Sequence, residues 1–224
     1  MYIKNQWYLA CFLEELSHQN PLKKKICGEE IVLFKTKGGT VGAIEDRCCH
    51  RNVNLSLGYI EGETIKCGYH GWQYNCEGKC VGIPSLSNDE RIPASAKVKK
   101  YIVEIKYQSV WIWIGDEDKT DKSLIPPMTE MNMYPMVYNY HFINADLPLV
   151  AESLFDAYHI NHVHRNSIKG MMGSLHQEKI DFNLQVSENS ITGKYWRDND
   201  RSIFERIYFG NNKKVETHFG FWFP

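Results

Sequence analysis

The most constraining feature of the sequence is a set of two cysteines and two histidines between residues 48 and 70. One residue separates Cys48 from His50, two separate Cys67 from His70, and sixteen residues lie between the two pairs. Each pair places one thiol and one imidazole on a short loop, and both groups are ligands of zinc and of iron–sulfur centres. The fold must therefore bring two loops together at one metal centre.

The way in which the ligands are shared between the loops favours an iron–sulfur cluster. In a Rieske [2Fe–2S] centre two cysteines hold one iron and two histidines hold the other, which raises the reduction potential to roughly −150 to +300 mV. Zinc fingers instead pair two cysteines on one loop and two histidines on another. We therefore predict a [2Fe–2S] cluster held by Cys48, His50, Cys67 and His70. A zinc-binding interaction module is the alternative, and Cys49 is predicted to be a packed free thiol.

Composition and charge exclude several other classes of protein. The 224 residues include 26 basic and 27 acidic ones, a formal net charge of −1, which removes the main electrostatic argument for nucleic-acid binding. The longest strongly apolar run, residues 110–114, is far shorter than the ~20 residues of a membrane helix. The N-terminus lacks the apolar region of a secretory signal, and seven cysteines, an odd number, suit a reducing compartment. We expect a cytoplasmic protein that binds neither nucleic acid nor membranes.

The first half of the chain is predicted to consist of β-strands. Short runs rich in Ile, Val, Trp and Tyr alternate with Gly-containing turns, as in a small antiparallel sandwich or barrel. We expect strands at residues 31–34, 40–44, 63–67, 72–74, 79–83, 101–107 and 110–114, the last two joined by a turn at Gln108-Ser109. A charged, proline-bearing segment follows. We therefore predict a β-domain at residues 1–116 and a linker at residues 117–127.

A second group of potential metal ligands follows this linker. Asp156, His159 and His164 have the spacing D-x2-H-x4-H. A helix over residues 149–159 would place Asp156 and His159 on one face, where the carboxylate can orient the imidazole. Because His164 lies about 140° further around an ideal helix, it can join the same metal only if the helix ends or bends before it. A solvated, histidine-rich helix end is the alternative interpretation.

The surroundings of this motif indicate a second, mixed domain. Asp146-Leu-Pro148 is a typical helix start, with the proline in the first turn. Strand-like runs return later, at residues 179–186, 191–196, 202–209 and 215–223. We therefore predict an α+β domain at residues 128–224.

The same residues resemble a known family. Residues 47–51 (Arg-Cys-Cys-His-Arg) and 67–72 (Cys-Gly-Tyr-His-Gly-Trp) resemble the Rieske domain of ring-hydroxylating and demethylating non-haem iron oxygenases. The opening, residues 2–10, is similar to the start of the vanillate O-demethylase and toluenesulfonate monooxygenase branch. The resemblance extends over essentially the whole chain. It implies an all-β Rieske domain, an antiparallel sandwich, followed by the N-terminal part of an α+β, helix-grip-like catalytic domain.

The resemblance also implies roles for the second motif. His159 and His164 match two ligands of a mononuclear Fe(II), whereas His162 has no counterpart in the family pattern. Asp156 matches the acidic residue that links this iron to a Rieske histidine, normally across a subunit boundary, and we expect its catalytic role to be this link. In the family the third ligand, a carboxylate, lies far beyond the histidines. We therefore expect a truncated or fragmentary α subunit; a split gene and a short natural protein are the alternatives.

The function implied is that of the terminal oxygenase component of a Rieske system. Electrons would pass from NAD(P)H through a reductase or ferredoxin to the cluster and then to Fe(II). There O₂ would be activated for mono- or dioxygenation, as hydroxylation or oxidative demethylation of an aromatic or other small organic acid. The complete protein is expected to be a homotrimer. The alternative is a Rieske-ferredoxin-type electron carrier, which accounts for the residues before 116 but not for the second motif.

Overall fold

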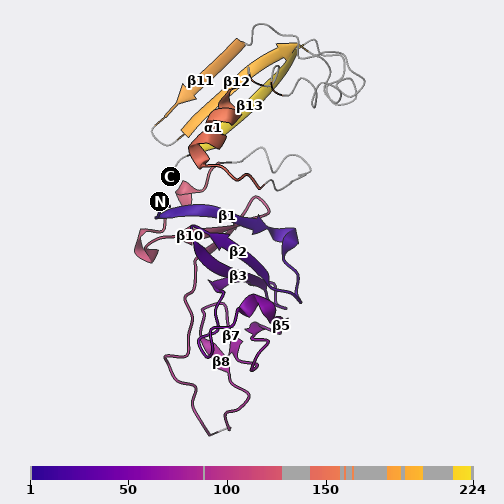
Figure 1. Cartoon of the computed structure of the whole chain (residues 1–224), viewed down its shortest axis with the longest axis vertical. Coiled ribbons are helices and arrows are strands. Elements are labelled where there is room, and N and C mark those ends of the chain that lie inside the picture. Colours follow the sequence, from indigo (N-terminus) through magenta and orange to yellow (C-terminus); the bar gives the residue numbers. More distant parts are fainter. Residues whose placement is uncertain are drawn as a thin grey trace. The chain divides into compact units, whose positions relative to one another are not determined.

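The structure is a computed structural model that describes residues 2–87, 89–127, 142–156, 159, 163, 181–187, 190–198 and 214–222. The chain divides into two compact units, residues 1–136 with Pro224 and residues 137–223. Each unit is described by itself. The described part of the first is built from short antiparallel strands, and that of the second from one α-helix and three strands (Figure 1).

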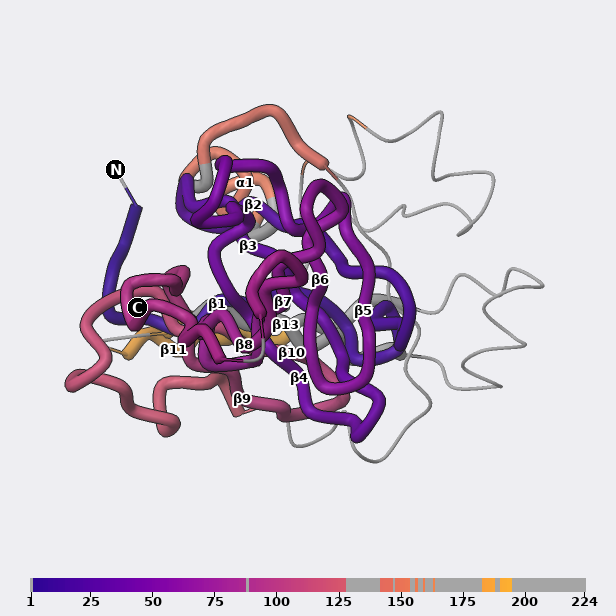
Figure 2. Tube along the Cα trace, turned by 90° about the horizontal axis from the view of Figure 1, so that it is seen from below, coloured from indigo at the N-terminus to yellow at the C-terminus, as the bar shows by residue number. Residues whose placement is uncertain are grey.

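The strands described in the first unit form three antiparallel sheets. One sheet has the order β1 (Gln6–Phe12), β10 (Ser109–Ile114), β9 (Val103–Lys106), and another has the order β2 (Leu22–Ile26), β3 (Glu29–Lys35), β4 (Val41–Glu45). The third joins β5 (Tyr59–Glu61), β6 (Thr64–Lys66), β7 (Gln73–Tyr74) and β8 (Cys80–Gly82). Within this unit the third sheet lies at the end opposite β1, and Figure 2 looks onto that end. The all-β fold expected for this part of the chain is confirmed.

Strand β3 lies in the middle of the unit because both of its faces are apolar. Ile31 and Leu33 pack into a core shared with β1 and β10, and Val32 and Phe34 pack into a second core shared with β6, β7 and β8. All four side chains are fully buried. Successive strand residues point to opposite faces, so an unbroken apolar run is typical of a strand covered on both sides. The second core also surrounds both cysteines of the predicted cluster site.

The predicted strands are present with boundaries shifted by a few residues, but β1, β2 and β5 were not predicted. Strand β2 (Leu-Lys-Lys-Lys-Ile) has a charged sequence because Lys23 and Lys25 lie on its exposed face and Lys24 is half-buried on the opposite face with Leu22 and Ile26. The turn predicted at Gln108-Ser109 lies one residue earlier. Tyr107 and Gln108 have φ values of 55° and 56°, the left-handed pair that a type I′ hairpin turn requires, and Ser109 already belongs to β10.

The segment predicted to be a linker packs against the first sheet along part of its length. It contains two short 3-10 helices, η3 (Glu117–Lys119) and η4 (Lys122–Leu124). Ile125 is 1% exposed and packs with Trp7, Trp111 and Trp113. The Trp7 indole N–H also donates to the carbonyl of Asp121 at 2.8 Å. The domain boundaries at residues 116 and 127 remain a prediction.

The second unit begins with the predicted helix, α1 (Leu147–Phe155). Asp146 is its N-cap residue and Pro148 is in its first turn, as the sequence indicated. Strands β11 (Asp181–Val186), β12 (Ser190–Asp198) and β13 (Lys214–Trp222) pair antiparallel in that order. They match three of the predicted strands, and the strand predicted at 202–209 lies outside the described residues. In the part of the chain that the structure describes, no helix has the length and apolar character of a membrane span.

The prediction that this helix continues to His159 is wrong. Helix α1 ends at Phe155, and Asp156 caps its C-terminus with φ −84° and ψ 87°. The Asp156 Oδ1 accepts a hydrogen bond from the His159 backbone N–H at 3.3 Å, the contact that an N-cap residue makes with a new helical turn. A short polar side chain can compete in this way for backbone donors. Asp156 and His159 therefore do not lie on one continuous helix.

Candidate iron–sulfur site

The two loops that carry the predicted cluster ligands share one backbone pattern. Each begins at a cysteine whose N–H donates to the carbonyl five residues later and whose carbonyl accepts from the N–H four residues later. These bonds, 2.8 to 3.0 Å long, join Cys48 N to Val53 O, Asn52 N to Cys48 O, Cys67 N to Trp72 O and Gly71 N to Cys67 O. The fourth residue after each cysteine has a left-handed φ, 58° at Asn52 and 73° at Gly71. The two cysteines thus occupy equivalent positions in two similar loops.

The first loop is fastened at its base by Asp46, a residue that the motif did not indicate. The carboxylate is buried and accepts hydrogen bonds from Asn54 Nδ2 at 2.9 Å, from Ser56 N at 2.7 Å and from Ser56 Oγ at 2.7 Å. Lys23 Nζ lies 3.7 Å from the same carboxylate and partly compensates its charge. Several donors on one carboxylate make a strong, well-oriented anchor. Asp46 therefore ties together the chain segments that enter and leave the loop.

The four predicted ligands form a buried pair of thiols and an outer pair of imidazoles. Cys48 and Cys67 are 2% and 3% exposed, whereas His50 is half-buried and His70 is exposed. The two imidazole rings pack edge to face with their centroids 4.8 Å apart. Burial raises the pKa of the Cys67 thiol, and the neighbouring Cys48 thiol adds to this effect. Thiol therefore lies next to thiol, and imidazole next to imidazole.

This separation into two pairs fits a two-iron cluster better than a zinc ion. A Rieske cluster needs two thiolates on one iron and two imidazoles on the other, whereas a structural zinc ion takes all four ligands around one point. The donor set and its burial thus match the predicted [2Fe–2S] cluster.

The outer pair of ligands is held by aromatic contacts. The His50 ring stacks on the Trp72 indole with an interplanar angle of 4° and a centroid distance of 4.6 Å. Tyr69 packs against His70 with a centroid distance of 3.9 Å. Burial lowers the pKa of His50, and the charges of His70 and Arg51 lower it further. A lowered pKa favours the neutral imidazole, which is the form that binds a metal.

Tyr74 is a further residue of the site, and it lies 26 positions after the cysteine that it contacts. Its hydroxyl is 3.1 Å from Cys48 Sγ and 3.3 Å from the backbone nitrogen of Cys49. When Cys48 is a thiolate it has no proton, so the phenol O–H is the only possible donor of the contact with its sulfur; the Cys49 sulfur, at 3.3 Å, is the other nearby acceptor. Burial raises the pKa of Tyr74 far above its usual value, and both thiols add to this effect, so the hydroxyl remains a donor.

Replacing Tyr74 with phenylalanine is expected to lower the reduction potential of the cluster without loss of its iron. A hydrogen bond to sulfur stabilises the more negative, reduced state. If the hydrogen bond stabilises the reduced cluster over the oxidised one by about 1.5 kcal/mol, its loss lowers the potential by about 60 mV for a one-electron couple. Potentiometric titration followed by EPR measures the change. An unchanged potential would show that the phenol does not donate to the cysteine sulfur.

Cys49 is not the packed thiol that we predicted. Its side chain is exposed, although Sγ lies 3.3 Å from the Tyr74 hydroxyl. Cys49 stands between two ligands on a surface loop, so the backbone that turns Cys48 inward leaves the next side chain at the surface. It is not among the buried residues that form the core.

The second motif is described at two of its three predicted residues. Besides the backbone contact above, the His159 Nδ1 lies 2.5 Å from the carbonyl oxygen of Asp156, which requires Nδ1 to be the protonated nitrogen and to donate. Nε2 is then the nitrogen with the lone pair, as a metal-ligating histidine needs. His164, and with it His162, lies outside the described residues. The assignment of His159 and His164 to an iron therefore remains a prediction.

Comparison with known proteins agrees with this geometry. The Rieske [2Fe–2S] domain family matches residues 6–102. The chain is 33% identical over 202 residues to the vanillate O-demethylase oxygenase subunit of Pseudomonas sp. (strain HR199 / DSM 7063), covering 89% of this chain and 54% of that protein. It is also 33% identical to the oxygenase component of dicamba O-demethylase from Stenotrophomonas maltophilia, covering 73% of this chain and 48% of that protein. The chain spans about half the length of these curated relatives.

Solved structures extend the likeness beyond the Rieske domain. Crystal structures of dicamba monooxygenase bound to 3,6-dichlorosalicylic acid and to dicamba superpose with a TM-score of 0.79 at 25% and 26% identity. Each match covers 98% of this chain, and 64% and 63% of the respective solved chain. Residues 6–102 are therefore a Rieske [2Fe–2S] domain, and the chain belongs to the Rieske non-haem iron oxygenase family.

Proposed function

We propose that this chain acts in the terminal oxygenase component of a Rieske system, in which electrons reach a mononuclear Fe(II) that activates O₂. The observation that carries the proposal is the extent of the structural likeness. The Rieske domain covers residues 6–102, whereas the match to dicamba monooxygenase covers 98% of the chain. A Rieske-ferredoxin-type electron carrier would need only the first part. The second unit, with its D-x2-H-x4-H motif, supports the oxygenase.

The site residues have two roles, metal binding and electron transfer. The two buried thiolates would hold one iron and the two outer imidazoles the other, and the bound cluster supplies one-electron transfer at a Rieske potential. Tyr74, whose hydroxyl contacts the Cys48 sulfur, would tune this potential. His159 and His164 would hold the mononuclear iron together with a carboxylate, leaving positions open for O₂. Asp156 would link the His159 site to a Rieske histidine.

The substrate class and partners follow from the relatives. Their names specify vanillate, toluene-4-sulfonate and dicamba. We propose a small organic acid, most simply an aromatic one, that is hydroxylated or oxidatively demethylated. An NAD(P)H-dependent reductase or a ferredoxin would supply the electrons in the cytoplasm. A homotrimer would let Asp156 of one subunit face the Rieske histidines of the next.

Oxygen consumption by the natural protein that carries this sequence tests the proposal. The assay contains NADH, a vanillate O-demethylase reductase, and vanillate, toluene-4-sulfonate or dicamba in turn, with formaldehyde as a second readout. We expect substrate-dependent O₂ uptake that is lost in His159→Ala while the cluster absorption stays unchanged, because the imidazole is an iron ligand only in the second site. Reduction of the cluster with no substrate-dependent uptake for any acid would favour the electron carrier.

A further inference from the structure

Two lysines face each other across a short antiparallel bridge beside the sheet formed by β5, β6, β7 and β8. Lys79 is paired with Lys97, and the bonds from Cys80 N to Ala96 O (2.9 Å) and from Val98 N to Gly78 O (2.8 Å) flank this pair. This is the non-hydrogen-bonded type of pair, in which opposite side chains come closest and share one face of the sheet. Like charges in this position destabilise the pairing. Because this repulsion does not stabilise the fold, the two lysines suggest a role in binding another molecule.

Neither of these lysines is neutralised within the described part of the chain. Both are exposed, and neither makes an ion pair with a described carboxylate, whereas Lys100 pairs with Glu77 at 3.0 Å and Lys99 pairs with Glu29. Glu77 is therefore already engaged by another lysine. The two ammonium groups at positions 79 and 97 remain available for negative charge from outside.

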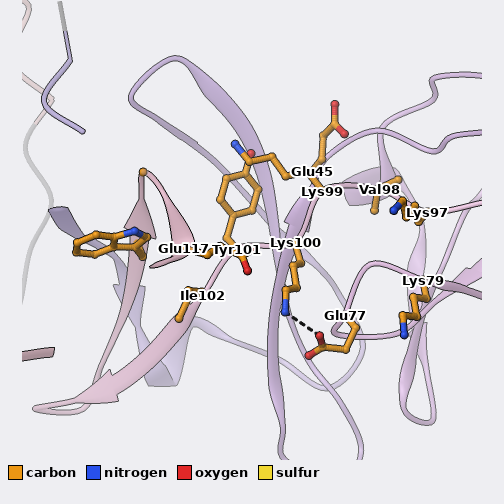
Figure 3. A pocket seen from close by; sticks show the side chains of 12 residues that line it. Glu45, Glu77, Lys79, Lys97, Val98, Lys99, Lys100, Tyr101, Ile102 and Glu117 are labelled. Atoms are coloured by element: carbon orange, nitrogen blue, oxygen red, sulfur yellow. Dashed lines mark hydrogen bonds and ion pairs between the residues drawn. The ribbon is translucent and has the colours of Figure 1, made fainter. Parts of the chain in front are cut away.

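The lysine pair belongs to an open cleft of about 660 Å³ (Figure 3). Figure 3 shows the Lys100–Glu77 pair in the cleft, with Lys79 and Lys97 on the side away from Tyr101. The side chains of Tyr101 and Trp113 are buried, so the accessible polar groups are mainly charged ones. The charged side chains are Lys79, Lys97, Lys99, Lys100, Glu45, Glu77 and Glu117. Glu45 pairs with Arg47 and Glu77 with Lys100, so Lys79 and Lys97 outnumber Glu117, the remaining carboxylate of the cleft.

The lysine pair is connected to the cluster site by two neighbouring strands. Cys80, next to Lys79, pairs with Tyr74 across β7 and β8. The Tyr74 hydroxyl is the group that contacts Cys48 Sγ at 3.1 Å. Cys80 and Val98, the neighbours of the two lysines, pack in the same core as Cys48. No cluster ligand lines the cleft, but Cys80 and Tyr74 connect its lysine pair to the Cys48 thiol, whereas the imidazoles form the outer edge of the site.

We propose that this cleft is the docking surface for the electron-donating protein, which presents an acidic surface to Lys79 and Lys97. The proposal rests on the proposed function, because an oxygenase needs one route for electrons to enter the cluster and another for them to leave. The imidazole edge is the exit toward Asp156 of the mononuclear site, so a donor covering that edge would block the transfer. The lysine cleft offers a separate entry.

A protein donor suits this surface better than a small anion does. The cleft is open, and the polar groups of its two buried aromatic residues are already bonded within the protein: the Tyr101 hydroxyl donates to Glu29 and the Trp113 indole N–H to the Asp116 carbonyl. Exposed positive charge instead steers a negatively charged partner and raises its association rate in a salt-dependent manner. The transfer moves one electron: the iron–sulfur or flavin centre of the donor is oxidised and the cluster is reduced. No bond forms or breaks.

Stopped-flow reduction of the cluster, without O₂ or substrate, tests the docking surface independently of oxygenase activity. The probe is an acidic plant-type [2Fe–2S] ferredoxin reduced with dithionite, and reduced methyl viologen is a small cationic control reductant. At an ionic strength of about 10 mM, where the Debye length is about 30 Å, we expect Lys79→Glu and Lys97→Glu each to slow reduction by ferredoxin about 5- to 20-fold. The matched control Lys37→Glu reverses an exposed lysine of the β3–β4 turn outside this cleft and should change the rate less than twofold.

The salt dependence and the second reductant distinguish weaker docking of the donor from damage to the cluster. At about 0.5 M salt the rates of the wild-type protein and the cleft variants should converge, because surface charges are then screened. Methyl viologen, a cation, should reduce the cleft variants at least as fast as the wild-type protein. Equal ferredoxin rates in the wild-type protein and both cleft variants would overturn the proposal, as would a matching loss of rate with methyl viologen.

Equal slowing by Lys37→Glu would also overturn it, because net charge, and not this cleft, would then steer the donor. Competition by millimolar inorganic phosphate that depends on both lysines would assign a small-anion site instead.

Discussion

Serine at position 48 or 67 is expected to abolish the [2Fe–2S] absorption and EPR signals completely, whereas Cys49→Ser should leave both signals in place. Serine supplies no thiolate, and the cluster needs one at each position. Cys48 and Cys67 are almost fully buried, at equivalent positions in two similar loops. Cys49 is exposed and next in sequence, so it is a matched control for the same chemical change.

Iron and sulfide analysis, together with circular dichroism, distinguishes loss of ligation from loss of folding. The backbone bonds that close each loop do not involve the thiols, so the β-sheet signal should persist in the Cys48→Ser and Cys67→Ser variants. Cluster loss in Cys49→Ser with retention in Cys48→Ser would overturn the ligand assignment. The zinc alternative would be supported if the wild-type protein binds zinc through all four ligands and shows no visible absorption after reconstitution with iron and sulfide.

Asp156→Asn is expected to slow electron transfer between the two metal centres about 10- to 100-fold while both metals stay bound. Asparagine is as good an N-cap residue as aspartate, so the contact with the His159 N–H and the break after α1 should persist. The variant therefore removes the negative charge and leaves the local backbone unchanged. Single-turnover kinetics of cluster oxidation, with substrate and O₂ present, measures the rate in the natural protein.

Asp146→Asn provides the control for this experiment. Asp146 is an exposed N-cap residue at the other end of α1, so the same change of charge there should leave the rate unaltered. Cluster potential and mononuclear iron content are measured in both variants. Loss of the mononuclear iron from Asp156→Asn would make the carboxylate an iron ligand, and an unchanged rate would show that it does not link the centres.

A Rieske-type site could be predicted because the chemistry and the spacing of its two cysteine–histidine pairs are both local; the assignment of the individual ligands stays a prediction. Few side chains bind iron, and each cysteine–histidine pair lies within one turn of the chain, so its geometry depends on residues that are neighbours in sequence. The strand at residues 31–34 was predicted from its apolar run beside a glycine-containing turn, which is also a local signal; that both of its faces are covered was shown only by the structure. The end of α1 was not predicted, because aspartate can extend a helix, cap it or bind a metal, and the sequence pattern does not distinguish these roles.

By itself the sequence determined the two cysteine–histidine loops, the β-character of the first unit and the start of α1 at Asp146. The tertiary structure decided which distant groups meet: Tyr74 at the Cys48 sulfur, Asp46 at the base of the first loop, and Lys79 opposite Lys97. These contacts join residues on different strands, so they depend on which strands pair and in what register. Register is set by the packing of whole faces against one core, and a single strand read in isolation carries no information about its partner.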